Sequence, residues 1–139
     1  MSRREERLAL ADYWMEKAAE SLRAAKVLLD ADITGASMSR LYYAAFYAAS
    51  ALFAAKGIQY GKHSAVQSAV HRDLVKPGII PKDLGALYDR MFNARQEGDY
   101  KAFTEFSTED VATELIEVER FIHRFNQLLT EEKDNTGTV

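Results

Sequence analysis

The sequence predicts an all-α protein, an antiparallel up-and-down four-helix bundle with a short additional helix. Three observations predict it. Long segments carry apolar residues at steps of three and four, no segment shows convincing strand alternation, and breaks with glycine or proline separate the segments. The 139 residues suffice for one domain, expected over 1–130, and 131–139 is expected to be a frayed or disordered tail because the apolar pattern ends there.

The first helix is expected over residues 4–31, followed by a turn at 32–35. Its apolar positions alternate in steps of three and four along more than three heptads: Leu8, Ala11, Met15, Ala18, Leu22, Ala25 and Leu29. Such a seam is typical of a helix that packs lengthwise against its neighbours in a bundle.

The second helix is expected over residues 36–56, with Gly57 as the residue that ends it. It is apolar on nearly every side, which predicts a position in the middle of the fold. Its many alanines allow close approach of neighbouring helices. The same helix carries Arg40, Tyr42, Tyr43 and Tyr47, whose polar groups need partners or a wet cleft if they are buried.

The remaining helices are expected at 63–75, at 81–97 and from Ser107 onward. Pro77 and Gly78 must end the first of these, and Ser107 is a suitable N-cap for the last. The fourth helix places Arg95 on the same side as Met91 and Phe92. The seam of the last helix consists of Val111, Leu115, Val118, Ile122, Phe125 and Leu129.

The net charge of −3 conceals an uneven distribution. Residues 56–82 have a net charge of +4 without the histidines, and residues 109–134 have a net charge of −5. The basic segment could hold phosphate locally, although solvated faces or a contact between subunits would explain both segments. The chain has no cysteine and no uncharged apolar stretch of about 18 residues, so we expect no disulfide, no membrane span and a cytoplasmic location.

Familiar enzyme signatures are missing from the sequence, and its three histidines are too far apart to suggest a local ligand set, so neither a metal nor a cofactor is expected. The residues that attract attention are Arg40 and the segment from Arg95 to Tyr100. In one interpretation Arg95 has a structural role and pairs with Asp99 or complements the end of its helix. In the other, Arg95, Arg40 and the tyrosines line a cleft that binds phosphate.

Four segments in this order resemble the HEPN domain family: Ser39–Ala49, Gly57, Lys62–Ser64 and Ala94–Tyr100. The arginine–tyrosine–tyrosine helix and the arginine–aspartate–tyrosine turn carry most of this resemblance, which extends over residues 12–129. It implies a helical bundle that commonly forms homodimers. It also implies either a metal-independent RNase, often a toxin, or a partner of a small nucleotidyltransferase in a toxin–antitoxin pair.

The resemblance implies an RNase site made of an arginine and a histidine with four to six residues between them. The arginine matches Arg95, but the following positions read Tyr100, Lys101 and Ala102. A tyrosine with an ordinary pKa near 10 is a poor base, and His63 could replace the histidine only if the fold brings it close to Arg95.

Three hypotheses follow. The first is a non-catalytic module that binds a nucleotide, an RNA phosphate or a nucleotidyltransferase, with ligand contacts from Arg40, Tyr43, Tyr47, His63, Arg95, Asp99 and Tyr100. The second is an RNase with a rearranged site, in which Arg95 stabilises the phosphate charge and His63, Asp99 or Tyr100 transfers the proton. The third is a structural dimerisation bundle whose inner polar residues only fix the packing register.

Overall fold

The computed structural model describes residues 1–100 and 105–135, apart from the side chains of residues 97–100. Within these residues the prediction of an all-α protein is confirmed, since no strand is present. The elements are α1 (Arg3–Asp30), α2 (Thr34–Ala55), α3 (His63–Ala69), the π-helix η1 (Val70–Val75), α4 (Lys82–Tyr100) and α5 (Thr108–Asn135). None of the described helices is long and apolar enough to cross a membrane.

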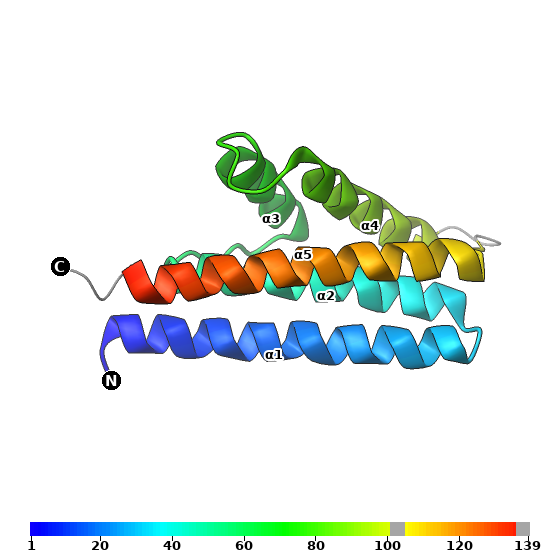
Figure 1. Ribbon diagram of the computed structural model, residues 1–139, viewed down its shortest axis with the longest axis horizontal. Helices are drawn as coiled ribbons and strands as arrows, with labels where there is room; N and C mark the ends of the chain where they lie inside the picture. Colours follow the sequence, from blue (N-terminus) through cyan, green and yellow to red (C-terminus); the bar gives the residue numbers. More distant parts are fainter. Residues whose placement is uncertain (101–104, 136–139) are drawn as a thin grey trace.

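The helix α2 lies at the centre of the fold and contacts α1, α3, α4 and α5 (Figure 1). Helices α1, α2 and α5 run along the long axis of the molecule, and α3 and α4 lie on the side opposite α1. The chain reverses direction from α1 to α2 and again from α4 to α5, as an up-and-down bundle requires. The predicted central position of the second helix is therefore correct, and the reason is its nearly uniform apolar surface.

Small side chains form the contact between α1 and α2, the most extensive helix pair in the fold. On α1, the residues Ala11, Ala18 and Ala25 recur every seven positions and are fully buried. Ser37 of α2 is also fully buried, and its hydroxyl donates a hydrogen bond of 2.7 Å to the carbonyl oxygen of Ala25. Because alanine and serine are small, the two backbones can approach closely.

The helix α5 extends farther than the sequence suggests. All six residues of its predicted seam are buried, but the helix continues to Asn135, so residues 131–135 of the expected tail are helical. A guanidinium nitrogen of Arg4 donates to the carbonyl oxygen of Lys133 at 2.6 Å, and the ammonium of Lys133 contacts Asp12 at 2.6 Å. These contacts with α1 explain the extension. Residues 136–139 lie outside the described residues.

The helix α4 also exceeds its predicted range, because it continues through Gly98 to Tyr100. A glycine inside a helix costs only about 1 kcal/mol, which tertiary contacts can offset. Two of these contacts join α4 to α5: Arg90 forms a bidentate pair with Glu114 at 2.9 and 3.0 Å, and Asp83 pairs with Arg120. Arg95 therefore lies inside a helix rather than at its last position.

Gly85 of α4 is buried against η1, and this contact leads to a stability prediction. A Cβ atom at this position would lie 2.7 Å from Cγ2 of Val75 and 3.1 Å from Cε1 of His71. We expect Gly85→Ala to lower the free energy of unfolding by about 1–2 kcal/mol, because overpacking outweighs the gain in helix propensity. Urea denaturation measures this change. The control is Gly35→Ala in α2, where nothing lies within 4 Å of the added atom, and equal stability of the two variants would contradict the prediction.

Candidate functional site

Two arginines from different helices meet on one tyrosine ring. The guanidinium carbon of Arg40 on α2 lies 4.7 Å from the ring centroid of Tyr43, and that of Arg95 on α4 lies 5.3 Å from the same centroid. Arg95 is also 5.7 Å from the ring centroid of Tyr42. Together with His63 on α3, these residues form what we call the arginine–tyrosine cluster. The sequence could not decide whether the two arginines share one site, and the structure places them together.

The periodicity of α2 explains which of its residues reach the cluster. Arg40, Tyr43 and Tyr47 are spaced by three and four residues, lie on one side of the helix and are all partly exposed. Tyr47 lies at the edge of the site, with its ring centroid 5.8 Å from that of Tyr43. Its other neighbour is Trp14 of α1, which stacks on it at 5.5 Å. Tyr47 thus joins the cluster to α1.

His63, the first residue of α3, is held in the cluster by Tyr42 and Phe46. Its Nδ1 atom is 2.9 Å from the hydroxyl oxygen of Tyr42, and its ring stacks on that of Phe46 with the centroids 4.2 Å apart. Partial burial and the nearby guanidinium of Arg95 lower the pKa of His63 below its ordinary value of 6.5. The imidazole is consequently neutral at pH 7, with Nδ1 engaged by the tyrosine.

The sequence singled out Tyr42 only as one of three tyrosines on the second helix, and Tyr42 was not among the predicted ligand contacts. It is fully buried, and burial raises the pKa of its hydroxyl to about 12, so the group stays protonated at neutral pH. Burial also raises the pKa of Tyr88 on α4, whose ring lies 6.2 Å from that of Tyr42. The available signal in the sequence was the four-residue spacing of Tyr42 and Phe46, which places both beside the helix face that carries Tyr43. The partner, His63, could not be deduced from it.

The electrostatics of the cluster favour an anion. Arg40 forms no hydrogen bond or ion pair with the side chains that the structure describes, and it shares the ring of Tyr43 with the guanidinium of Arg95. Like charges that share one ring repel each other, and a bound anion would relieve this repulsion. A guanidinium presents a planar fork of donors that matches phosphate oxygens, and the tyrosine faces support it by cation–π contact. Neutral His63 can add one further donor or acceptor.

The other two histidines do not join the cluster in the described part of the chain. His71 contacts Asp89 at 2.9 Å, where it ties η1 to α4, and His123 is exposed on α5. Among the described residues there is no group of three or more side chains that could hold a metal ion. The predictions for Asp99 and Tyr100 concern side chains outside those that the structure describes.

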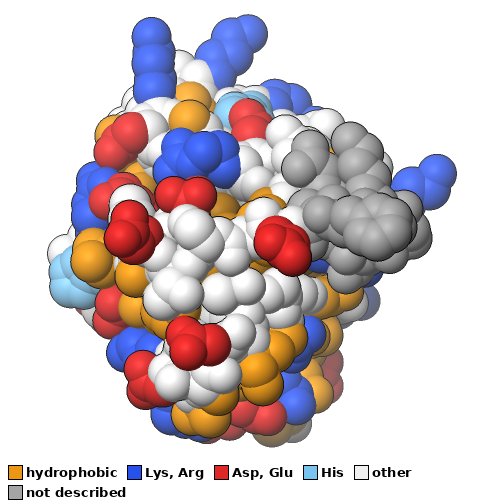
Figure 2. All heavy atoms as spheres, turned by 90° about the vertical axis from the view of Figure 1, so that its right-hand side faces the viewer, with side chains coloured by type: hydrophobic (Ala, Val, Ile, Leu, Met, Phe, Trp, Pro, Cys, Tyr) orange, Lys and Arg blue, Asp and Glu red, His pale blue; other side chains and the backbone are white. Residues whose placement is uncertain are grey.

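The basic segment predicted from the sequence is exposed. Its lysines and its arginine all lie at the surface: Lys56, Lys62, Arg72, Lys76 and Lys82. Figure 2 looks onto the end of the bundle where α4 finishes, and Lys and Arg side chains project from its upper edge, on the side of α3 and α4. Lys62 directly precedes His63 of the cluster.

An up-and-down bundle in which Arg40 of the central helix and Arg95 of a neighbouring helix lie on the ring of Tyr43 defines the protein as an all-α helical module. The HEPN domain model matches residues 11–129, and the chain belongs to this family. It is 39% identical over 128 residues to a UPF0332 protein of Thermotoga maritima, a match that covers 92% of this chain and 97% of the relative.

Two further relatives come from Methanocaldococcus jannaschii. The chain is 34% identical over 118 residues to a protein named "Putative toxin MJ0605", covering 84% of this chain and 87% of the relative. It is 30% identical over 128 residues to "Putative toxin MJ0142", covering 88% and 87% of the two chains.

Proposed function

We propose that this protein is a HEPN module that binds the phosphate of a nucleotide or an RNA at the arginine–tyrosine cluster, as one component of a toxin–antitoxin pair. The observation that carries the proposal is the placement of the Arg40 and Arg95 guanidinium groups over the single ring of Tyr43. The names of the two archaeal relatives support the toxin–antitoxin setting. A homodimer and a nucleotidyltransferase partner are part of the same proposal, and they rest on the family resemblance.

Titration calorimetry of a short RNA and of ATP, at low salt and with EDTA present, tests the phosphate site. We expect Arg95→Ala to weaken binding about 10- to 150-fold, because a hydrogen bond to a charged group contributes about 1.5–3 kcal/mol. Arg40→Ala should have an effect in the same direction, and Arg95→Lys should restore part of the affinity, since lysine keeps the charge but loses the fork.

The matched control for this titration is Arg90→Ala. Arg90 lies on the same helix as Arg95 but is exposed and paired with Glu114, so we expect its loss to leave the affinity nearly unchanged. Absence of binding by the unmodified protein would contradict the proposal. Equal affinities of the Arg95→Ala and Arg90→Ala variants would contradict it as well.

The assembly part of the proposal has separate tests. Light scattering of the purified protein measures whether it is a dimer in solution. Co-expression with the product of the neighbouring reading frame, followed by affinity purification, measures whether a nucleotidyltransferase binds it. A monomer at all concentrations would contradict the homodimer, and a neighbouring reading frame without any nucleotidyltransferase pattern would contradict the partner. Neither result would affect the phosphate site.

One observation favours a second function, metal-independent cleavage of RNA. The fold brings His63 next to Arg95, so a histidine from α3 lies beside the arginine that matches the family's RNase motif. Cleavage would require the neutral imidazole to take the proton of a ribose 2′-hydroxyl while Arg95 stabilises charge on the phosphate. Incubation of the protein with RNA and EDTA tests this function, and its products would carry 2′,3′-cyclic phosphate ends.

A further inference from the structure

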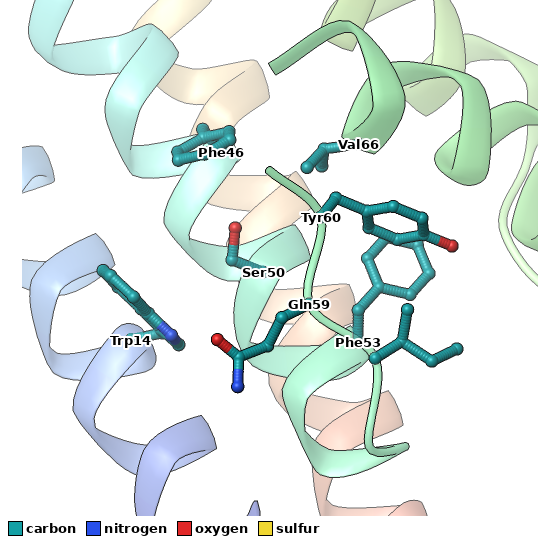
Figure 3. Close-up of a pocket in the computed structure, with 8 residues that line it drawn as sticks. Trp14, Phe46, Ser50, Phe53, Gln59, Tyr60 and Val66 are labelled. Carbon is teal, nitrogen blue, oxygen red and sulfur yellow. The ribbon is translucent and has the colours of Figure 1, made fainter. Parts of the chain in front are cut away.

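A second site adjoins the arginine–tyrosine cluster. It is a pocket of about 170 Å³ between α1, α2, the connector that follows α2, and the start of α3. The side chains around it are Trp14, Phe46, Ser50, Phe53, Ile58, Gln59, Tyr60 and Val66 (Figure 3). None of these eight side chains is charged, and four of them are aromatic. The pocket therefore suits an uncharged group that can lie against aromatic rings.

The aromatic walls of the pocket are held in place by their neighbours. Trp14 stacks on Tyr47 with an angle of 14° between the ring planes. On the opposite side, Phe53 meets Tyr60 edge to face at 5.5 Å, and the hydroxyl of Tyr60 accepts a hydrogen bond from Arg72. A ring entering the pocket would find these walls already positioned, which reduces the entropic cost of binding.

Two polar side chains give the pocket a way to recognise an edge of a ring. Figure 3 shows the hydroxyl of Ser50 and the amide of Gln59 between Trp14 on one side and Phe53 and Tyr60 on the other. Neither polar group forms a hydrogen bond with another side chain in the described part of the structure, so both are available. A glutamine amide offers a donor and an acceptor, the combination that binds the edge of a nucleobase.

Size and position narrow the choice of ligand. A cavity of about 150 Å³ holds one benzene ring, so this pocket has room for a single six-membered ring. Phe46 forms part of its wall, and the same ring stacks on His63 of the arginine–tyrosine cluster at 4.2 Å. Between a group in the pocket and a phosphate at the arginines lie the rings of Phe46 and Tyr43, whose centroids are 6.4 Å apart.

We infer that this pocket binds one pyrimidine base of the nucleotide or RNA whose phosphate the arginine–tyrosine cluster holds. The inference rests on the proposed phosphate site for its biological setting, but the pocket makes a separate contact. The base lies against Trp14, and Ser50 and Gln59 bond its edge, as single-stranded RNA bases are bound elsewhere by stacking and edge contacts. Pyrimidines are preferred because a purine has a second ring.

Trp14 is the only tryptophan of the chain, and it therefore supplies a specific probe. Protein labelled with 5-fluorotryptophan gives one ¹⁹F resonance, which we expect to shift on titration with uridine or cytidine. These nucleosides carry no phosphate, so their binding does not depend on the arginines, and Arg95→Ala should leave it unchanged. Adenosine and guanosine should bind about tenfold more weakly. The double variant Ser50→Ala/Gln59→Ala should weaken uridine binding about 5- to 150-fold through the loss of two hydrogen bonds.

The control variant is Gln127→Ala, an exposed glutamine on α5 outside the pocket, which should bind uridine like the unmodified protein. Toluene serves as a ring without polar edges, and toluene binding as tight as uridine binding would overturn the assignment to a base. If no nucleoside shifts the ¹⁹F resonance, the assignment of the pocket to a base is also overturned, even if RNA binding still depends on Arg95. If uridine binds but Arg95→Ala leaves RNA binding unchanged, the assignment of the pocket stands and the phosphate site is overturned.

Discussion

Replacing His63 with glutamine is expected to lower the rate of metal-independent RNA cleavage by about 10²- to 10⁴-fold, the usual contribution of a general acid or base. The reason is geometric as well as chemical. His63 approaches the hydroxyl of Tyr42 at 2.9 Å and stacks on Phe46, so its ring has a fixed orientation beside Arg95. Glutamine retains the ability to form hydrogen bonds but cannot take up a proton near neutrality.

The pH profile of cleavage provides a second test of the same role. Burial and the guanidinium of Arg95 lower the pKa of His63, so the neutral, proton-accepting form exists at pH values where an ordinary histidine is charged. If His63 is the base, the rate rises with pH through a pKa below 6.5 and levels off above that pKa. A rate that still rises between pH 7 and pH 9 would indicate a different base.

The matched control for His63 is His123→Gln on α5, an exposed position outside the cluster, which should retain the full rate. Tyr42→Phe removes the hydroxyl that orients His63 and should lower kcat more than it changes KM, because the phosphate contacts of the arginines remain. RNA left intact by the unmodified protein in EDTA would remove the cleavage hypothesis. That result would leave phosphate binding as the function supported by the cluster.

Periodicity was sufficient to predict most of the fold. The seams on α1 and α5 are buried or partly buried at every predicted position, because steps of three and four select one side of a helix whatever lies opposite. The ends of α4 and α5 were predicted too early. Gly98 does not end α4, and contacts of Lys133 with α1 extend α5 beyond the last apolar residue. Contacts between distant segments decide where such helices end, and the local sequence does not reveal these contacts.

The site could be predicted only in part, for a related reason. The polar residues on α2 and α4 stand out because each interrupts an apolar helix face. Periodicity does not reveal which helices are neighbours, so the meeting of Arg40 with Arg95 and the contact of Tyr42 with His63 required the structure. The π-helical geometry of η1 was also unpredictable, since the sequence indicates a helix there but not its hydrogen-bond spacing.

Truncation of Phe121 to alanine is expected to lower the free energy of unfolding by about 3–5 kcal/mol, the range found for buried phenylalanines. Phe121 of α5 is fully buried and stacks on Phe125 at 4.2 Å. It also packs against Tyr88 of α4, with the ring centroids 5.8 Å apart. The loss comprises the transfer free energy of the ring and the cost of the remaining cavity. Urea denaturation followed by circular dichroism measures the change.

The same helix supplies the control, since Ile116 is 59% exposed and its truncation to alanine should change stability by no more than about 0.5 kcal/mol. Similar losses for the two variants would contradict the core described for α5.

The truncation of Phe121 also affects the arginine–tyrosine cluster. Tyr88 lies between Phe121 and Tyr42, and Tyr42 in turn holds His63. A cavity beside Tyr88 would loosen this series of rings while leaving Arg40 on Tyr43. The folded Phe121→Ala variant should therefore lose more cleavage activity than RNA affinity, whereas Arg95→Ala should lose both.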